Sequence, residues 1–262
     1  MGGDGYLERY LDRSGVIEWD RSAFGPVSAA PAAARVAWLL ACIEADSTSQ
    51  AVKVARAGFS RAEDVGTFLP QWYEEEQEHG RVLFAIAEAC GIEPPRSARL
   101  STDADQRGQP PGWLGAVLGR VPGADAAYLA TAAAAEYIAR GMYSWLAEAY
   151  AGSPVVARLL RDLAAQEARH LGFYRAAAEA RLVRSPLARQ LAPMLFSRFW
   201  RPVGIDTLGW STWFDAFGEL ITDPVLQRRF LGMDRMIGAL PGFAGVEPLQ
   251  SFLRARSIAI AA

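Results

Sequence analysis

The chain has little cysteine, with only Cys42 and Cys90 among its 262 residues. Two cysteines that lie so far apart exclude a disulfide framework and a Cys-x-x-Cys site, so nothing in the sequence implies an oxidising compartment. We therefore expect a cytoplasmic protein in which both cysteines are small core residues rather than redox centres.

Charge of one sign and long apolar runs are also lacking. The formal net charge is −2 and no long basic run occurs, which argues against the electrostatic footprint of a nucleic-acid-binding protein. No apolar stretch approaches the roughly 18 residues of a membrane span. Residues 1–6 have no apolar core of a signal peptide. We expect a soluble protein that neither crosses a membrane nor binds nucleic acid.

Histidine is equally scarce, and its placement is the most informative feature of the chain. The two histidines each follow a glutamate by three residues, in Glu76-Gln-Glu-His79 and Glu167-Ala-Arg-His170. Glu-x-x-His places a carboxylate and an imidazole on one face of a helix, about one turn apart. Both side chains of each motif can therefore hold the same metal ion.

A further glutamate precedes each of these motifs at nearly the same distance. Glu44 lies 32 residues before Glu76, and Glu136 lies 31 residues before Glu167. Four carboxylates and two imidazoles are the ligand set of a dinuclear iron or manganese centre inside a four-helix bundle. Hard oxygen ligands with imidazole favour two iron ions, with manganese as an alternative in one or both positions, and the lack of thiolate ligands argues against structural zinc.

Each proposed ligand interrupts an apolar stripe on its predicted helix, which indicates that it faces the bundle core. An unpaired carboxylate there would cost several kcal/mol, so four of them need shared protons or cations. Two divalent metal ions provide the cations. By symmetry, Glu76 and Glu167 would bridge the metals, Glu44 and Glu136 would each chelate one, and His79 and His170 would complete the two sides.

The alternative interpretation of one Glu-x-x-His motif is a solvated pair on a helix surface. The conjunction of two motifs with two upstream glutamates favours the metal site, and we assign Glu74, Glu75 and Glu78 to the solvated face of the same helix. Tyr73 and Tyr174 could donate hydrogen bonds to ligands or hold a radical, although an ordinary buried tyrosine is the simpler interpretation.

The sequence predicts one all-α domain over residues 1–262, a four-helix bundle with a long crossover. Helix-boundary prolines and glycines, with a capping box at Ser60–Glu63, predict helices over 31–57, 60–91, 124–151 and 153–185, and a short one over 113–118. The predicted parts are an N-terminal lead-in (1–30), a first helix pair (31–91), a crossover (92–123), a second helix pair (124–185) and C-terminal packing helices (186–262).

The residues beside the ligands resemble those of one family. Trp72-Tyr-Glu-Glu-Glu76-Gln-Glu-His79-Gly80 resembles the first metal motif of the soluble acyl-carrier-protein desaturases, which belong to the ferritin-like di-iron carboxylate superfamily. Ala164-Ala-Gln-Glu167-Ala-Arg-His170-Leu-Gly-Phe-Tyr174 resembles their second motif. The resemblance covers about residues 31–182 and implies a ferritin-like bundle.

The resemblance also implies a function. Members use two irons, dioxygen and two electrons from a ferredoxin-type donor to remove hydrogens from an acyl chain on acyl carrier protein, and they work as homodimers. The chain differs from the family pattern at Ala139, where threonine is common, and at Gln166, which replaces an acidic residue and can hydrogen-bond a ligating histidine without carrying charge. Oxygenation of a small metabolite, by hydroxylation or N-oxygenation, stays open as a second reaction, and metal storage as a non-catalytic alternative.

Overall fold

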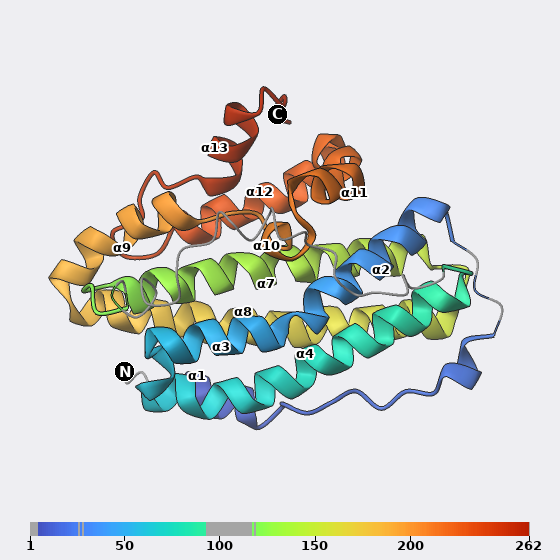
Figure 1. Ribbon diagram of the computed structural model, residues 1–262, viewed down its shortest axis with the longest axis horizontal. Helices are drawn as coiled ribbons and strands as arrows, with labels where there is room; N and C mark the ends of the chain where they lie inside the picture. Colours follow the sequence, from blue (N-terminus) through green and yellow to red (C-terminus); the bar gives the residue numbers. More distant parts are fainter. Residues whose placement is uncertain (1–4, 26, 28, 93–116, 118, 262) are drawn as a thin grey trace.

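The computed structural model describes residues 5–25, 27, 29–92, 117 and 119–261. All regular secondary structure in these residues is helical. Long helices lie side by side along the longest axis of the molecule, and shorter helices cover one side of them (Figure 1). The predicted all-α bundle is therefore confirmed.

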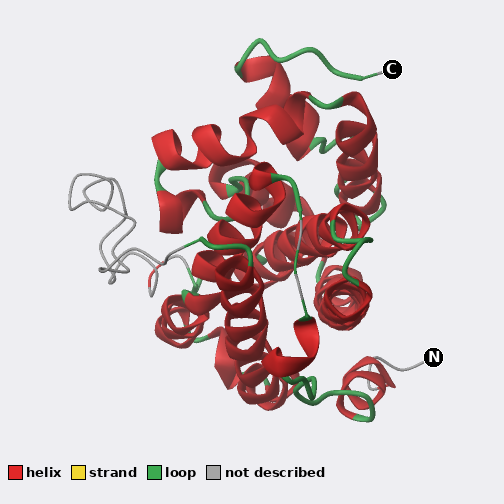
Figure 2. Ribbon diagram, turned by 90° about the vertical axis from the view of Figure 1, so that its right-hand side faces the viewer, coloured by secondary structure: helices red, strands yellow, loops and turns green. Residues whose placement is uncertain are grey.

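Two helix pairs form the bundle. α2 (Pro31–Ala45) packs on α4 (Glu63–Ala89), and α7 (Ala124–Ala149) packs on α8 (Pro154–Arg184). Each pair is antiparallel, whereas α4 and α7 run in the same direction, so the chain must return between the end of α4 and the start of α7 (Figure 1). Figure 2 shows the same helices after a quarter turn, with several of the long ones seen nearly end-on. This topology confirms the long crossover. The short helix predicted over 113–118 falls, apart from residue 117, outside the described residues.

The first predicted helix, over 31–57, is divided in the structure. α2 ends at Ala45, and α3 (Ser47–Ala57) begins after Asp46, whose backbone has φ −82° and ψ 3°. The Asp46 carboxylate accepts a hydrogen bond from Thr207 Oγ1 at 2.9 Å, so this joint also holds a later segment of the chain against the bundle. A contact so distant in sequence cannot be found from local helix signals.

The predicted capping box at Ser60–Glu63 is wrong. Ser60 lies inside a short 3-10 turn, η2 (Phe59–Arg61), and α4 begins at Glu63 with Ala62 as its N-cap. The turn follows directly from Gly58, which ends α3 in the left-handed conformation at φ 78°. Ser60 is therefore not at the position from which its hydroxyl could cap α4.

The helices after residue 185 cover the side of the bundle formed by α2 and α7, as expected for packing helices (Figure 1). α10 and α11 contact α2, while α9 and α12 contact α7. Two glycines allow the close approach of α12 to α7. A Cβ on Gly232 would lie 2.0 Å from the hydroxyl oxygen of Tyr137, and one on Gly141 would lie 2.8 Å from the ring of Phe230. The bounds are α9 (Pro186–Phe199), α10 (Ile205–Leu208), α11 (Trp210–Thr222), α12 (Pro224–Gly238) and α13 (Pro248–Ala255).

The N-terminal lead-in follows the opposite side of the bundle. α1 (Gly5–Leu11) packs against α8 and α4, and the chain then runs along the lower edge of Figure 1, through the short turn η1 (Arg21–Phe24), before it enters α2. Trp19 Nε1 donates a hydrogen bond to Glu78, and Arg21 pairs with Glu88 at 2.5 Å. These contacts hold the lead-in along α4.

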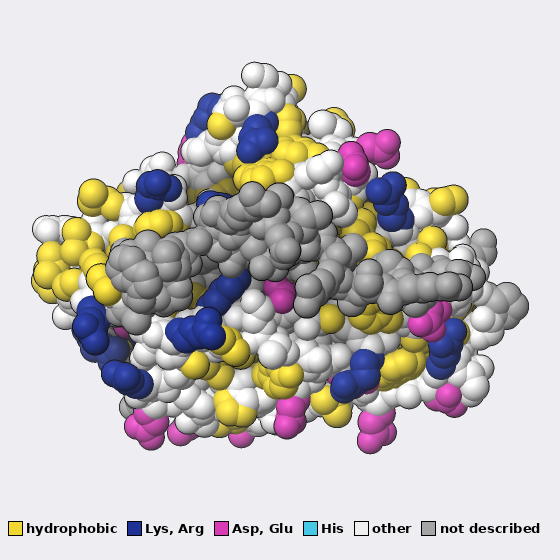
Figure 3. Space-filling view, in the orientation of Figure 1, with side chains coloured by type: hydrophobic (Ala, Val, Ile, Leu, Met, Phe, Trp, Pro, Cys, Tyr) yellow, Lys and Arg dark blue, Asp and Glu magenta, His cyan; other side chains and the backbone are white. Residues whose placement is uncertain are grey.

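The surface carries charges of both signs. On the face drawn in Figure 3, basic and acidic side chains are interspersed, with acidic ones along the lower edge, which agrees with the small net charge of −2. Among the described helices, none is long and apolar enough to cross a membrane.

Candidate metal centre

The six predicted ligands come together inside the bundle, and all are buried. They form two overlapping groups, in each of which one ligand atom per residue lies within 4.8 Å of the others. Glu76 is shared by both groups, as the predicted bridging role requires. The first group is Glu76 on α4, Glu136 on α7, and Glu167 and His170 on α8; the second is Glu44 on α2 with Glu76 and His79 on α4.

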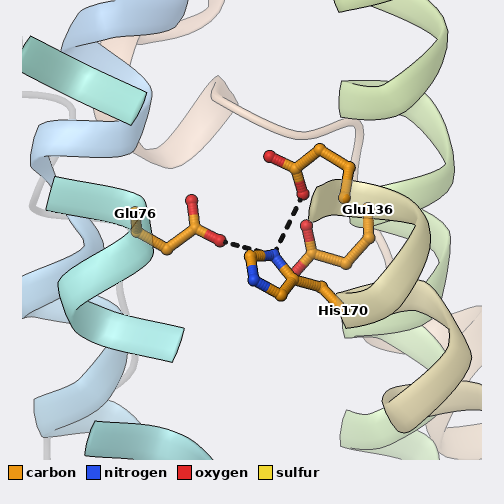
Figure 4. A group of neighbouring side chains, drawn as sticks. Glu76, Glu136 and His170 are labelled. Atoms are coloured by element: carbon orange, nitrogen blue, oxygen red, sulfur yellow. Dashed lines mark hydrogen bonds and ion pairs between the residues drawn. The ribbon is translucent and has the colours of Figure 1, made fainter. Parts of the chain in front are cut away.

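Both histidines direct the same ring nitrogen into the centre. Nδ1 of His170 lies 3.0 Å from Glu76 Oε1 and 3.2 Å from Glu167 Oε2. Figure 4 shows the carboxylates of Glu76 and Glu136 pointing towards the imidazole of His170 from different helices. Nδ1 of His79 lies 2.9 Å from Glu167 Oε1 and 3.6 Å from Glu76 Oε2. The two imidazoles therefore share one space with the two central carboxylates.

The outer nitrogen of His79 is held by Gln166. Nε2 of His79 lies 2.9 Å from Gln166 Oε1, while Gln166 Nε2 donates to the backbone carbonyl of Gly15 at 2.6 Å. Because a carbonyl can only accept, the amide nitrogen of Gln166 must face Gly15 and its oxygen must face the histidine. His79 consequently carries a proton on Nε2, which leaves Nδ1 as the inner ligand atom.

The outer nitrogen of His170 is held by Glu75, which the sequence assigned to the solvated face. That assignment is wrong, because Glu75 is fully buried and its Oε2 lies 2.7 Å from His170 Nε2. The carboxylate also accepts the hydroxyl of Tyr10 at 2.8 Å and the backbone N–H of Gly15 at 2.6 Å. Burial alone would raise the pKa of Glu75, but hydrogen bonds from His170, Gly15 and Tyr10 hold it below its ordinary value.

One residue of the lead-in therefore connects the partners of both histidines. Gly15 donates its N–H to Glu75 and accepts from Gln166 through its carbonyl. Its φ of 144° is a backbone conformation that residues with a side chain rarely adopt. Residues 1–30 had no predicted role, because a glycine in an irregular segment carries no signal by which this contact could be predicted from the sequence.

The tyrosines take roles that the sequence did not separate. Tyr143 on α7, which lies on the predicted inward stripe of its helix, donates from its buried hydroxyl to Glu44 Oε1. Tyr73 is half-buried, and its hydroxyl lies 3.1 Å from that of Thr48 rather than bonded to a ligand. Tyr174 packs its ring edge-on against Phe68, with centroids 4.9 Å apart, which fits the simpler interpretation of an ordinary buried tyrosine.

The ionisable groups of the centre differ in the direction of their pKa shifts. Burial and the charges of neighbouring carboxylates hold the pKa values of Glu44 and Glu136 well above the ordinary value. Burial would also raise the pKa of Glu76, but hydrogen bonds from both histidines hold it well below the ordinary value. Burial would lower the pKa values of the two histidines, yet the surrounding carboxylates raise both well above the ordinary value. Without metal, protons therefore balance the charge of the glutamates.

The donor set fits a pair of divalent cations. Glu76 Oε1, His79 Nδ1 and Glu167 Oε1 are buried and have no partner with hydrogen-bond geometry among the described residues. They lie at ion-pair distances within the centre, 2.9 Å between His79 Nδ1 and Glu167 Oε1 and 3.0 Å between Glu76 Oε1 and His170 Nδ1, but their poor alignment leaves them incompletely satisfied, which is costly in a buried site. All three atoms belong to residues of the two candidate metal groups, so cations held by these groups would satisfy them. The identity of the six residues as ligands stays a prediction, which this arrangement supports.

In a comparison with protein families, the model described as Rubrerythrin matches residues 127–190. The matched segment includes most of α7 and all of α8, with Glu136, Glu167 and His170. Comparison with curated proteins and with solved structures gives no match. Together with the carboxylate and histidine groups, the match supports a ferritin-like helical fold with a site consistent with a di-metal carboxylate centre. It gives no support to the acyl-carrier-protein desaturases in particular.

Proposed function

We propose that this protein is a di-iron oxidoreductase that uses dioxygen to oxidise a lipophilic substrate. The observation that carries the proposal is the pair of buried imidazoles that direct Nδ1 into a space shared with four carboxylates. Carboxylate and imidazole ligands suit iron, with manganese in one or both positions as the alternative. Two such metals, when bound, supply the electrons and the Lewis acidity that dioxygen chemistry requires.

The residues of the chain have distinct tasks in this proposal. Glu76 and Glu167 would bridge two bound metals, Glu44 and Glu136 would each hold one, and the histidines would complete the two sides. Glu75 and Gln166 fix the ring orientation of the histidines through Nε2. The Tyr143 hydroxyl donates a hydrogen bond to Glu44 Oε1 and so keeps its proton beside this carboxylate. Among the described residues, this is the one hydrogen bond from a tyrosine to a proposed ligand.

The reaction outcome depends on what lies beside the metals. The resemblance to the desaturases implies an acyl chain on acyl carrier protein as the substrate, a ferredoxin-type electron donor and a homodimer. We include this substrate, this donor and this oligomeric state in the proposal. Oxygenation is the second candidate, because Ala139, on the inward face of α7 one turn after Glu136, offers no hydroxyl where the family commonly has one.

The test begins with metal content. Protein purified aerobically is expected to hold about two iron or manganese ions per chain, and Glu76→Ala is expected to lower that number because it removes the shared ligand. Glu74→Ala, at an exposed neighbouring position, is the matched control. Fewer than one metal per chain in the native protein, with Glu76→Ala as stable as the control, would refute the metal centre.

The second part of the test measures chemistry. The protein is reduced anaerobically, then given oxygen and a medium-chain acyl-carrier-protein, and the products are weighed by mass spectrometry. Loss of two hydrogens supports desaturation and gain of one oxygen atom supports oxygenation. Loaded protein that takes up oxygen without any organic product, while it accumulates ferric iron, would refute the oxidoreductase and favour storage.

A further inference from the structure

Five apolar side chains form a patch on α9 and at its two ends. Leu187, Leu191 and Met194 follow one another at steps of four and three residues, so they share one face of α9. Val183 lies in the last turn of α8, and Phe199 is the last residue of α9. Leu191 is half-buried and the other four side chains are exposed. Figure 3 shows hydrophobic side chains gathered at this end of the molecule, at the left, and we call the five residues the α9 patch.

The opposite face of α9 already provides its packing. Ala188, Ala192 and Phe196, each four residues apart, are buried, and α9 contacts α7 and α8. The helix therefore does not need the apolar side chains of its other face in order to pack. Among the described residues, nine large apolar side chains are exposed, and four of them belong to the patch. Such a concentration of exposed apolar side chains is typical of an interaction surface.

The segment that carries the patch is basic, although the chain as a whole has a net charge of −2. No acidic residue occurs between Glu179 and Asp206. Arg201 pairs with Asp206 at 3.6 Å. The guanidinium of Arg198 lies 5.6 Å from the ring centre of Phe199, so positive charge and apolar surface adjoin. Three exposed arginines of this segment form no ion pair with a described residue: Arg184, Arg189 and Arg198.

We propose that the α9 patch binds the surface of an anionic phospholipid membrane, with α9 lying along the interface. In helices of this kind the apolar side chains enter the boundary between headgroups and acyl chains, while arginines extend to the phosphates. α9 has 14 residues and so presents a ridge of about 20 Å. Each arginine adds an attraction to anionic headgroups, and each exposed apolar side chain leaves water. The inference does not rest on the proposed function, because it uses none of the metal ligands.

Two other occupants suit the patch less well. In a two-fold dimer through the patch, a second copy of the chain would place the same arginines near one another, and their charges would repel. A protein partner commonly anchors its binding in a pocket, whereas the patch lies at the rounded left end of the molecule (Figure 3). A bilayer requires no pocket, and its headgroups offer anions to all three arginines at once.

Co-sedimentation of the full-length protein with vesicles tests the binding. One set contains two parts of phosphatidylcholine to one of phosphatidylglycerol, and the control set contains phosphatidylcholine alone. We expect binding to the anionic set to be at least about tenfold tighter. Raising the salt concentration from about 0.1 to about 1 M should weaken this binding, because it shortens the Debye length from about 10 to about 3 Å. Equal binding to both sets, or no binding to the anionic set, would overturn the proposal.

Matched substitutions locate the binding surface. Met194→Glu is expected to weaken binding at least about tenfold, since it replaces an inserted apolar side chain by a charge. Val225→Glu, on α12, adds the same charge at a position of similar exposure, 62% against 68% for Met194, and is expected to leave binding unchanged. Arg198→Gln is expected to weaken binding about fivefold, whereas Arg228→Gln, at an exposed position on α12, should leave it unchanged. Equal effects within either pair would overturn the proposal.

Sedimentation velocity of the native protein and of Met194→Glu addresses the second copy as the occupant. Association that rises with protein concentration, is lost in Met194→Glu and occurs without binding to anionic vesicles would overturn the membrane proposal in favour of a dimer. The comparison of the two vesicle sets uses native protein only, so it stays decisive even if a variant does not fold. Because these measurements require no oxygen and no product, membrane binding can fail while the redox test above succeeds, and the reverse is equally distinguishable.

Discussion

Glu75→Gln tests whether the carboxylate behind His170 prepares the metal centre. In the native protein this carboxylate accepts three hydrogen bonds, from Tyr10, Gly15 and His170. Glutamine is nearly isosteric, but its amide nitrogen must face one of these donors, and the charge behind the imidazole is lost. Changes of this kind typically cost 10- to 100-fold in metal affinity, equivalent to about 1.4–2.8 kcal/mol.

The assay is a competition titration of metal-free protein against a calibrated chelator, with Mn²⁺ or anaerobic Fe²⁺. Glu74→Gln is the control, since it makes the same chemical change one residue away on the exposed side of α4. We expect the dissociation constant to rise at least tenfold for Glu75→Gln and less than twofold for Glu74→Gln. If both variants bind metal as the native protein does, the reasoning that links Glu75 to the ligand geometry is refuted.

Three further predictions concern protons, stability and packing. The pKa values of both histidines and of Glu44 and Glu136 are raised, so these four groups carry protons in the metal-free protein. Metal binding should therefore release about four protons and weaken as pH falls. Calorimetry in buffers of different ionisation enthalpy measures the number of protons released, and a release of zero would contradict the prediction. Chelation of a metal present at 100 times its dissociation constant should remove about 2.7 kcal/mol of stability and lower Tm by several degrees. An unchanged Tm would show that no metal binds the folded state. Gly232→Ala should destabilise the protein by about 1–3 kcal/mol through its clash with Tyr137, whereas Gly218→Ala, with open space around it, should be neutral or stabilising by up to about 1 kcal/mol in urea unfolding; equal effects would contradict the packing argument.

Helical periodicity was sufficient to predict the bundle and to bring the six proposed ligands to its centre. Each carboxylate lies on the inward face of one helix, and the spacing of three residues between glutamate and histidine is a local property. The long crossover also followed from local signals, because helix-breaking residues cluster between α4 and α7. Such features depend only on residues that are neighbours along the chain, so they can be predicted from the sequence alone.

The residues that orient the histidines could not be predicted in the same way. Glu75 lies between exposed Glu74 and the proposed ligand Glu76, and the partners that hold its carboxylate, Tyr10 and His170, are more than 50 residues away. Thr207, which holds the joint between α2 and α3 at Asp46, acts across 161 residues. Contacts of this range depend on tertiary packing, for which a single sequence carries no periodic signal.

The position of Gly15 has a practical meaning for anyone who shortens the chain. Deleting residues 5–15 would leave all four ligand-bearing helices whole, and circular dichroism would still report a helical protein. It would nevertheless strip Glu75 of two hydrogen-bond donors and Gln166 of the carbonyl that sets its amide. A truncated protein that folds but loads metal poorly would therefore reveal a defect in a segment that contributes no ligand of its own.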